Sequence, residues 1–423
     1  MRMSLFLPPL FYLFATMGSS SSIHVPSDCS SIQEAIDAAA SNDVIVVADG
    51  TYFENIRFKG KTLTLKSENG PEACIINGSM NGPVVSFDQG EGHRSIMEGF
   101  TITNGSGKTF SDSGLHYHYG GGIYIEDASP AILNNHICAN RLPPFSGSTI
   151  VIEGGGLFSG HPMGGAWLGS PVIRGNEIFD NFSGGHGGGI AIAAPSLDET
   201  LLMENNMIYG NRSDANGGGV YISQFASARL LNNQIFENQS WNGGGVYCWS
   251  YGIDDACVIF HNNMIHNNTA DNWGGAASFH FVGILSVNNT YADNRSLRQG
   301  GGIYFETCRG RLINDILWGN VGDVLGRQGY LQSYSGIRIF HSALEAGLDG
   351  FHVTPTSVLN LGAGIVTIHP LFEPGFQNYH ILSLSPCKNA GKNTAPGMML
   401  TDFEGERRIY NLIVDIGADE YQP

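Results

Sequence analysis

The feature that most constrains this 423-residue chain is a short phrase, Asn-x-Ile-x-x-Asn, written six times with Tyr replacing Ile in the last copy. The spacings between copies are 41, 30, 27, 30 and 26 residues. The copies begin at Asn135, Asn176, Asn206, Asn233, Asn263 and Asn289. Glycine triplets followed by an apolar residue lie between them. A period in this range is typical of a solenoid, in which each repeat buries its apolar face by stacking on its neighbours.

The apolar residues come in short period-2 runs that glycine and asparagine interrupt, which favours short strands over helices. Asn tolerates a left-handed backbone and can hydrogen-bond along a column of its own kind, while glycine allows tight corners and close approach of coils. The sequence therefore predicts an all-β, right-handed parallel β-helix with coils about 4.8 Å apart. A sandwich of antiparallel hairpins is the alternative, but two-residue hairpin turns are missing and the repeat is too long for a strand pair.

The ends of the chain carry their own signals. Residues 1–20 combine Arg2, an apolar run over 5–14 and small residues at 18–20, which predicts a signal peptide and a secreted, periplasmic or cell-surface protein. The run is too short for a membrane anchor. The capping box from Ser31 to Glu34 predicts a short helix over 31–40 that covers the open first coil. We expect the β-helix with its cap over 21–320, and the last coils with a C-terminal cap module over 321–423.

The formal net charge of −17 argues against nucleic acid and anionic membranes as partners. A polyanionic glycan would then need a local basic patch or bridging Ca²⁺. Seven cysteines in an exported chain leave at least one unpaired. The two pairings that the spacing suggests are Cys29 with Cys74 and Cys248 with Cys257.

Several segments resemble a known family. Residues 31–37 (Ser-Ile-Gln-Glu-Ala-Ile-Asp), 47–56 and 65–70 resemble the opening of pectin-lyase-like β-helix proteins, and 120–320 resembles exported bacterial repeat proteins of that fold. The tail, with Val-Asp-Ile-Gly-Ala-Asp-Glu-Tyr at 414–421, resembles the C-terminal module often attached to them. The resemblance covers nearly the whole mature chain and implies the fold. It leaves the activity open, because this fold hosts lyases, hydrolases, esterases and adhesins.

Insertions predict where a ligand would lie. Long loops at 105–119 and 141–153 leave one corner of adjacent coils, and long segments also follow the strand after several glycine triplets. The outer face of that strand should therefore be a trough walled on both sides. Alternation predicts two outward columns. The first is Tyr124, Phe158, Ala191, Tyr221, Tyr247, Ala277 and Tyr304, and the second is Glu126, Gly160, Ala193, Ser223, Trp249, Phe279 and Glu306.

Exposed rings at coil spacing suit the apolar faces of sugars. The predicted sugar contacts are Tyr124, Phe158, Tyr221, Tyr247 and Trp249, with Trp167 and Trp241 on the walls. The equally weighted alternative is a ladder of rings that stabilises the sheet.

Polar candidates for chemistry lie near the same face. Glu153 and His186 directly precede glycine triplets of successive coils, Glu126 ends the strand and His118 lies in the loop 105–119. Such groups supply general acid and base catalysis. Two carboxylates about 5–9 Å apart would suit a hydrolase, and a His or Tyr base with Ca²⁺ or Arg would suit a lyase. Asp254 and Asp255 could bind Ca²⁺, although a solvated loop pair is the commoner case.

The sequence therefore yields two functional hypotheses. In the first, an exported β-helix protein binds an extracellular polysaccharide in a lateral groove, with or without cleavage by a lyase or glycoside hydrolase reaction. In the second, it is a non-catalytic surface or matrix protein with an adhesive or structural role. Neither hypothesis involves nucleic acid or a transmembrane anchor, and Ca²⁺ is the one cofactor considered.

Overall fold

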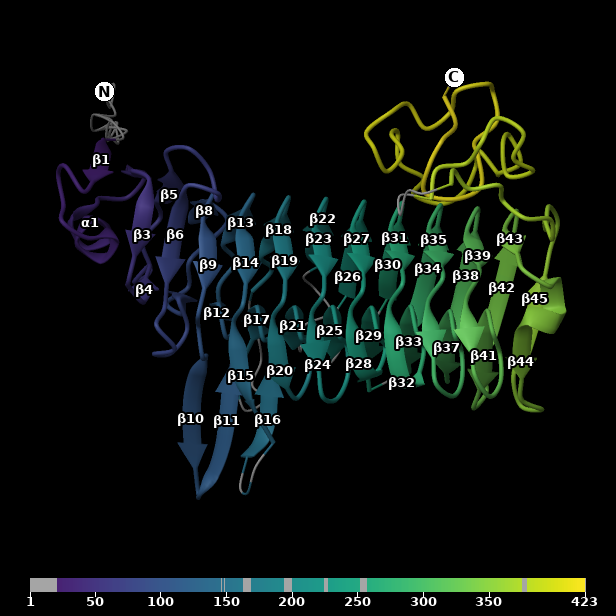
Figure 1. The fold of residues 1–423 in the computed structure, drawn as a ribbon, viewed down its shortest axis with the longest axis horizontal. Coiled ribbons are helices and arrows are strands. Elements are labelled where there is room, and N and C mark those ends of the chain that lie inside the picture. The colour runs from purple at the N-terminus through teal and green to yellow at the C-terminus, as the bar shows by residue number, and fades with distance from the viewer. Residues whose placement is uncertain are drawn as a thin grey trace, which may run out of the picture.

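The computed structural model describes residues 21–145, 147, 149–162, 169–193, 200–223, 227–251, 257–374 and 379–422. They form a long solenoid of stacked parallel strands with one short helix at its N-terminal end (Figure 1). The predicted signal peptide and three predicted site residues, Trp167, Asp254 and Asp255, lie outside the described residues. Within these ranges no helix is both long and apolar enough to cross a membrane.

Each full coil passes through four sheets in turn, which we number 1 to 4. Sheet 1 joins, in order, β1 (Ser22–Val25), β2 (Val44–Val47), β5 (Thr64–Ser67), β8 (Ile96–Glu98), β13 (Ala131–Leu133), β18 (Val172–Arg174), β22 (Thr200–Glu204), β26 (Ser227–Leu231), β30 (Cys257–His261), β34 (Gly283–Val287), β38 (Arg309–Ile313), β42 (Gly336–Phe340) and β45 (Val358–Leu361). Sheet 2 joins β3 (Gly50–Tyr52), β6 (Cys74–Asn77), β9 (Thr101–Thr103), β14 (His136–Cys138), β19 (Glu177–Phe179), β23 (Met207–Tyr209), β27 (Gln234–Phe236), β31 (Met264–His266), β35 (Thr290–Ala292), β39 (Ile316–Trp318) and β43 (Ala343–Leu344).

The other two sheets complete the coil, and a small fifth sheet projects from it. Sheet 3 joins β15 (Arg141–Pro144), β20 (Phe182–Gly184), β24 (Arg212–Ser213), β28 (Gln239–Asn242), β32 (Thr269–Trp273), β36 (Arg295–Ser296) and β40 (Val321–Gly322). Sheet 4 joins β4 (Ile56–Arg57), β7 (Val85–Phe87), β12 (Ile123–Glu126), β17 (Leu157–Gly160), β21 (Ile190–Ala193), β25 (Val220–Ser223), β29 (Val246–Trp249), β33 (Ala277–His280), β37 (Ile303–Glu306), β41 (Gly329–Gln332) and β44 (Phe351–Val353). The projecting sheet, called the wing, joins β10 (Lys108–Asp112), β11 (Leu115–Tyr119) and β16 (Thr149–Glu153) (Figure 1). A 3-10 turn, η1 (Gly347–Gly350), lies between β43 and β44.

The repeat positions stack as the sequence predicts. The central residues of the repeated phrase pair in register from coil to coil, and each is at most 1% exposed. They are Ile137, Ile178, Ile208, Ile235, Ile265 and Tyr291. The right-handed parallel β-helix with a continuous apolar interior is therefore confirmed.

Two asparagine ladders hold the corners on either side of sheet 2. In the second ladder, Asn211 donates from Nδ2 to the carbonyl of Ile178 at 2.7 Å and to Oδ1 of Asn238 at 3.0 Å. It accepts from the backbone and side chain of Asn181 at 3.1 and 3.0 Å. The left-handed backbone falls on the residue before each ladder position, such as Asn205 or Glu237, rather than on the ladder Asn itself. The buried amides are thus satisfied by the coils above and below.

Glycine triplets form the corner between sheets 3 and 4. The first glycine has a positive φ, +64° at Gly187, and a Cβ on the second, Gly188, would lie 2.5 Å from the carbonyl oxygen of Gly218 in the next coil. Side chains at these positions would separate the coils, which explains why the triplet recurs.

The N-terminal helix α1 (Ile32–Ala38) is shorter than the predicted 31–40. Ser31 caps it, and the Oγ of Ser31 accepts a hydrogen bond from the backbone N–H of Glu34 at 3.2 Å. The inner face of the helix buries Ile32, Ala35 and Ile36. The helix therefore covers the apolar end of the first coil, as expected.

The coils continue to β45, and residues 362–374 and 379–422 then run back along the side of the solenoid over its later coils (Figure 1). This C-terminal segment uses the corner between sheets 1 and 2, where Asn288 Nδ2 donates to the carbonyls of Asp415 and Gly417 at 3.1 and 3.2 Å. All seven cysteines are free thiols, so neither suggested disulfide pairing is present.

Candidate functional site

The outer face of sheet 4 carries the predicted columns with one correction. In β33 the pairing register matches Tyr247 with Ser278 and Trp249 with His280. Ala277 and Phe279, which the sequence analysis assigned to the outer columns, therefore lie in the core. The prediction slipped by one residue because the glycine triplet of this coil is degraded to Gly274-Gly275-Ala276.

The rings of the first outer column are stacked but not exposed. Tyr124 and Phe158 have no exposed surface, and Tyr221 and Tyr247 are 7% and 9% exposed. Their centroids are 5.8 Å apart in the first pair and 5.7 Å in the second. The wing packs over the N-terminal part of the column. The expectation of open rings is wrong for these four residues, because neighbouring side chains cover them.

Two histidines complete the column where its own residue is small. His186 stacks on Tyr221 with a centroid distance of 4.6 Å beside Ala191. His280 stacks on Tyr247 at 4.8 Å, and its Nε2 lies 2.8 Å from Ser278 Oγ. The Nδ1 of His280 lies 3.0 Å from Glu306. Ser278 is fully buried, so this serine–histidine–glutamate chain is a packed polar network rather than an accessible nucleophile.

Glu153 and His186 occupy successive coils, as the sequence predicts, and form a parallel β-bridge. Glu153 is 7% exposed, and its burial raises the pKa of the carboxyl to about 7. Burial lowers the pKa of His186 to about 4, so its imidazole is neutral at pH 7. The buried Nδ1 of His186 has no hydrogen-bond partner among the described residues. This pair therefore offers a carboxyl group poised to exchange a proton near neutral pH, beside a neutral base.

Glu126 lies at the other end of the sheet-4 strand from the corner that holds Glu153. Its Oε2 accepts a hydrogen bond from the hydroxyl of Tyr124 at 2.7 Å and lies 3.4 Å from Lys108 Nζ. Lys108 also reaches Asp88 at 3.2 Å. Lys108 was not among the predicted site residues. Lys108 and Phe110 are two positions apart in β10, so alternation along a strand places both on the face toward the sheet-4 rings. Glu126 is thus engaged in an ion-pair network.

His118 is not part of this group. In β11, Tyr117 and Tyr119 pack toward the sheet-4 rings, so the alternating His118 lies on the opposite face of the wing. There its Nδ1 lies 3.0 Å from Thr109 Oγ1, and it lines a cavity of about 450 Å³ with Arg141 and Phe182. The structure therefore separates His118 from the other three predicted catalytic residues.

Two of the predicted sugar contacts have open surface. Trp241 in β28 is 49% exposed. Trp249 in β29 is half-buried, and its ring centroid lies 4.6 Å from that of Tyr251. These tryptophans follow one another on sheets 3 and 4 of the same coil, on either side of the glycine corner.

Among the described residues, His380, Glu404 and Asp419 bring metal-binding side-chain types within 4.8 Å of one another. Both imidazole nitrogens are already engaged, Nδ1 with Asp419 at 3.2 Å and Nε2 with Glu404 at 3.0 Å. The hydrogen bond to Asp419 raises the pKa of His380 to about 9. A protonated imidazole donates both its protons and cannot ligate a metal, so the cluster fits an ion-pair network better than a metal site.

Comparison with known proteins gives a family and distant structural similarities. The family model described as "Right handed beta helix region" matches residues 29–254. No curated protein matches the chain. The A-module of the mannuronan C-5 epimerase AlgE4 of Azotobacter vinelandii is 13% identical, with 80% of this chain and 91% of that chain covered at a TM-score of 0.42. XylC in complex with xylose is 10% identical, with 92% and 95% covered at a TM-score of 0.42. At this distance neither structure informs activity.

Proposed function

This chain belongs to the family of right handed beta helix regions, and on that premise we propose that it binds and cleaves an extracellular polysaccharide along the outer face of sheet 4. The observation that carries the proposal is the adjacent pair of Glu153 and His186, with a raised carboxyl pKa and a neutral imidazole. Perturbed pKa values of this kind cluster at functional sites. Export through the segment 1–20 would bring the protein to such a polymer.

The chemistry follows from the protonation states. Because burial raises its pKa to about 7, the Glu153 carboxyl can donate a proton to a glycosidic oxygen or accept one from a sugar carbon near neutral pH. His186 is neutral and can accept a proton through its unpartnered nitrogen. Hydrolysis follows when the oxygen is protonated and water adds to the anomeric carbon as the glycosidic bond breaks. Elimination follows when the proton beside a uronate carboxylate is removed, the glycosidic oxygen leaves and a C=C bond forms.

A second candidate function rests on a different observation. The ring column is buried, and its stacking continues through Tyr304, Tyr330 and His352 at 4.8–5.5 Å. Such a column stabilises the stack without any ligand. A non-catalytic adhesive or structural protein would need this column and would not need an acid and a base.

The test is a panel of plant and algal polysaccharides, assayed for absorbance at 235 nm and for new reducing ends. Unsaturated products identify elimination, and reducing ends without absorbance identify hydrolysis. We expect Glu153→Gln and His186→Ala to abolish turnover, whereas Glu68→Gln, at an exposed position in the early coils, leaves it unchanged. Retained polysaccharide binding with no product from any substrate would establish the adhesive or structural function instead.

A further inference from the structure

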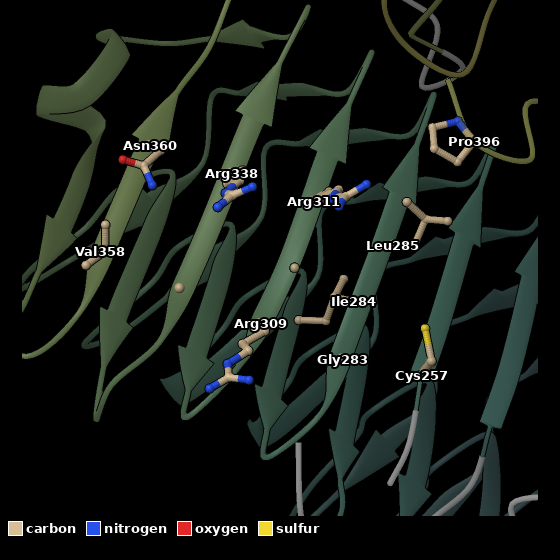
Figure 2. A pocket seen from close by; sticks show the side chains of 12 residues that line it. Cys257, Gly283, Ile284, Leu285, Arg309, Arg311, Arg338, Val358, Asn360 and Pro396 are labelled. Carbon is tan, nitrogen blue, oxygen red and sulfur yellow. The ribbon is translucent and has the colours of Figure 1, made fainter. Parts of the chain in front are cut away.

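The outer face of sheet 1 holds a cavity that the site on sheet 4 does not use. It has a volume of about 690 Å³ and lies over the later coils (Figure 2). Its floor comes from β30, β34, β38, β42 and β45, and Pro396 of the C-terminal segment lines its upper margin (Figure 2). Ala395 and Met398 of the same segment pack against Val287 and Ile313, which fixes that margin to the sheet.

Three arginines supply the charge among the mainly apolar residues that line this cavity. Arg311 and Arg338 occupy directly paired positions on β38 and β42, and Asn360 continues the row on β45. Arg309 lies on the neighbouring row and also lines the cavity (Figure 2). Arg311 and Arg338 are both exposed. Within the part of the chain that the structure describes, neither has a carboxylate within the 4.0 Å of an ion pair.

Arg311 and Arg338 place two positive charges at directly paired positions. Like charges directly opposite each other on neighbouring strands repel. The chain has 38 acidic and only 21 basic residues. Even so, none of the described carboxylates forms an ion pair with Arg311 or Arg338. An anion between the two guanidinium groups would turn the repulsion into attraction, because each group can bind a carboxylate through two parallel N–H donors.

A glycine keeps the cavity open. Gly336 pairs with Arg309 in the outer row of β42, and a Cβ at this position would meet no atom within 4 Å. Its φ is not in the left-handed region, so the backbone does not require glycine there. A larger side chain at 336 would fill the space beside the arginines without straining the chain.

From this geometry we propose that the sheet-1 cavity binds the carboxylates of an acidic polysaccharide that runs along the solenoid axis. Arg311 and Arg338 bind carboxylates, and Asn360 offers an amide to a sugar hydroxyl. Successive positions of the row are one coil step apart, about 4.8 Å, which is comparable to the length of a sugar unit. The proposal rests on the proposed function in taking a polysaccharide as the ligand, and it names its class as uronate-containing. A site of this kind resolves the conflict between a net charge of −17 and a polyanionic ligand.

Calorimetric titration of the full mature chain with hexagalacturonate tests the proposal, with xylohexaose as the neutral control. We expect Arg311→Gln combined with Arg338→Gln to weaken binding of hexagalacturonate at least about tenfold, and Gly336→Leu to do the same. Arg229→Gln is the matched control, because Arg229 is exposed in the same outer row, three strands before Arg311, and does not line the cavity. It should leave the affinity unchanged, and the product assays on the polysaccharide panel report separately on the site beside sheet 4.

Three results would overturn the inference: unchanged affinity of the double variant, equal binding of xylohexaose, or full competition by inorganic phosphate at the concentration of hexagalacturonate. Thermal unfolding without ligand supplies a further readout. The double variant should be at least as stable as the natural chain, since it relieves the repulsion between Arg311 and Arg338. A clear loss of stability would assign the arginines a structural role and also refute the proposal.

Discussion

At the scale of single residues, the outer face of sheet 4 depends on the side chains that fill the gaps between the stacked rings. Ala191 and Ser278 are too small to continue the column, and His186 and His280 stack in their place. His186 does so without a partner for its buried Nδ1 in the part of the chain that the structure describes, whereas His280 has Ser278 and Glu306. The unsatisfied histidine beside the buried Glu153 is therefore the one available for chemistry.

Glu153→Gln should change how stability depends on pH. The folded-state pKa of about 7 exceeds the ordinary value of 4.5, so the folded chain binds more protons than the unfolded chain between these two pH values. The free energy of unfolding therefore falls as pH rises through this window, by about 3 kcal/mol. The glutamine variant lacks this loss and should be the more stable protein at pH 8.

Chemical denaturation of both proteins at pH 5 and pH 8 measures the difference. Comparing the two proteins at each pH removes the opposite contribution of His186, whose lowered pKa of about 4 adds stability as pH rises. Equal pH dependence in the two proteins would show that the pKa of Glu153 in the folded chain is not raised, and would contradict the prediction.

The asparagine ladder makes a second prediction at this scale. Asn211→Ala removes two donated and two accepted hydrogen bonds and leaves their partners buried. We expect a loss of at least about 3 kcal/mol in the free energy of unfolding, measured in denaturant. Gln239→Ala, at an exposed position in the adjacent strand, should cost less than about 0.5 kcal/mol. A similarly small loss for Asn211→Ala would mean that the hydrogen bonds of the ladder do not stabilise the stacking of the coils.

Residue-scale features differ in how well the sequence predicts them. The inward position of Ile208 or Ile235 follows from period and apolarity alone. The burial of Tyr221 does not, because it depends on His186 from the preceding coil, and a single-strand pattern contains no information about that contact. The position of His118 failed for a related reason, since a loop read as irregular is in fact a pair of strands with two faces.

At the scale of elements, the C-terminal segment is the part that repeat logic describes least. It contacts the solenoid through isolated hydrogen bonds. The Tyr379 hydroxyl donates to Asp293 Oδ2 at 2.9 Å, and the backbone N–H of Lys392 donates to Asn314 Oδ1 at 2.7 Å. These contacts join residues 78 or more positions apart. No periodic pattern encodes them, so the sequence indicates a module without indicating which face it covers.

The ion-pair network of this segment should make its attachment depend on pH. The pKa of His380 is raised to about 9, so its stabilising contribution is complete below the ordinary value of 6.5 and is lost as pH rises through 9. Limited proteolysis should cut within residues 379–422 faster at pH 9.5 than at pH 6, relative to a denatured control. His380→Gln should remove the difference between the two pH values, and an unchanged difference in that variant would assign the effect elsewhere.

At the scale of the whole molecule, the two proposed ligand surfaces lie on different sides of one stack. Glu153 and His186 lie at the corner beside sheet 4, and the arginines lie on sheet 1 over the later coils. The fold was predictable because its repeat and its core obey one rule in every coil. The sheet-1 cavity was not, because Arg311 and Arg338 become neighbours only once the coil register is known and the C-terminal segment is in place.

The most direct test of the central claim is a crystal structure of the Glu153→Gln variant soaked with an oligosaccharide of the polysaccharide that gives product in the panel assay. The account predicts a sugar unit within hydrogen-bonding distance of the residue 153 amide and of His186 on the outer face of sheet 4. A bound oligosaccharide that leaves both side chains buried and untouched would contradict it.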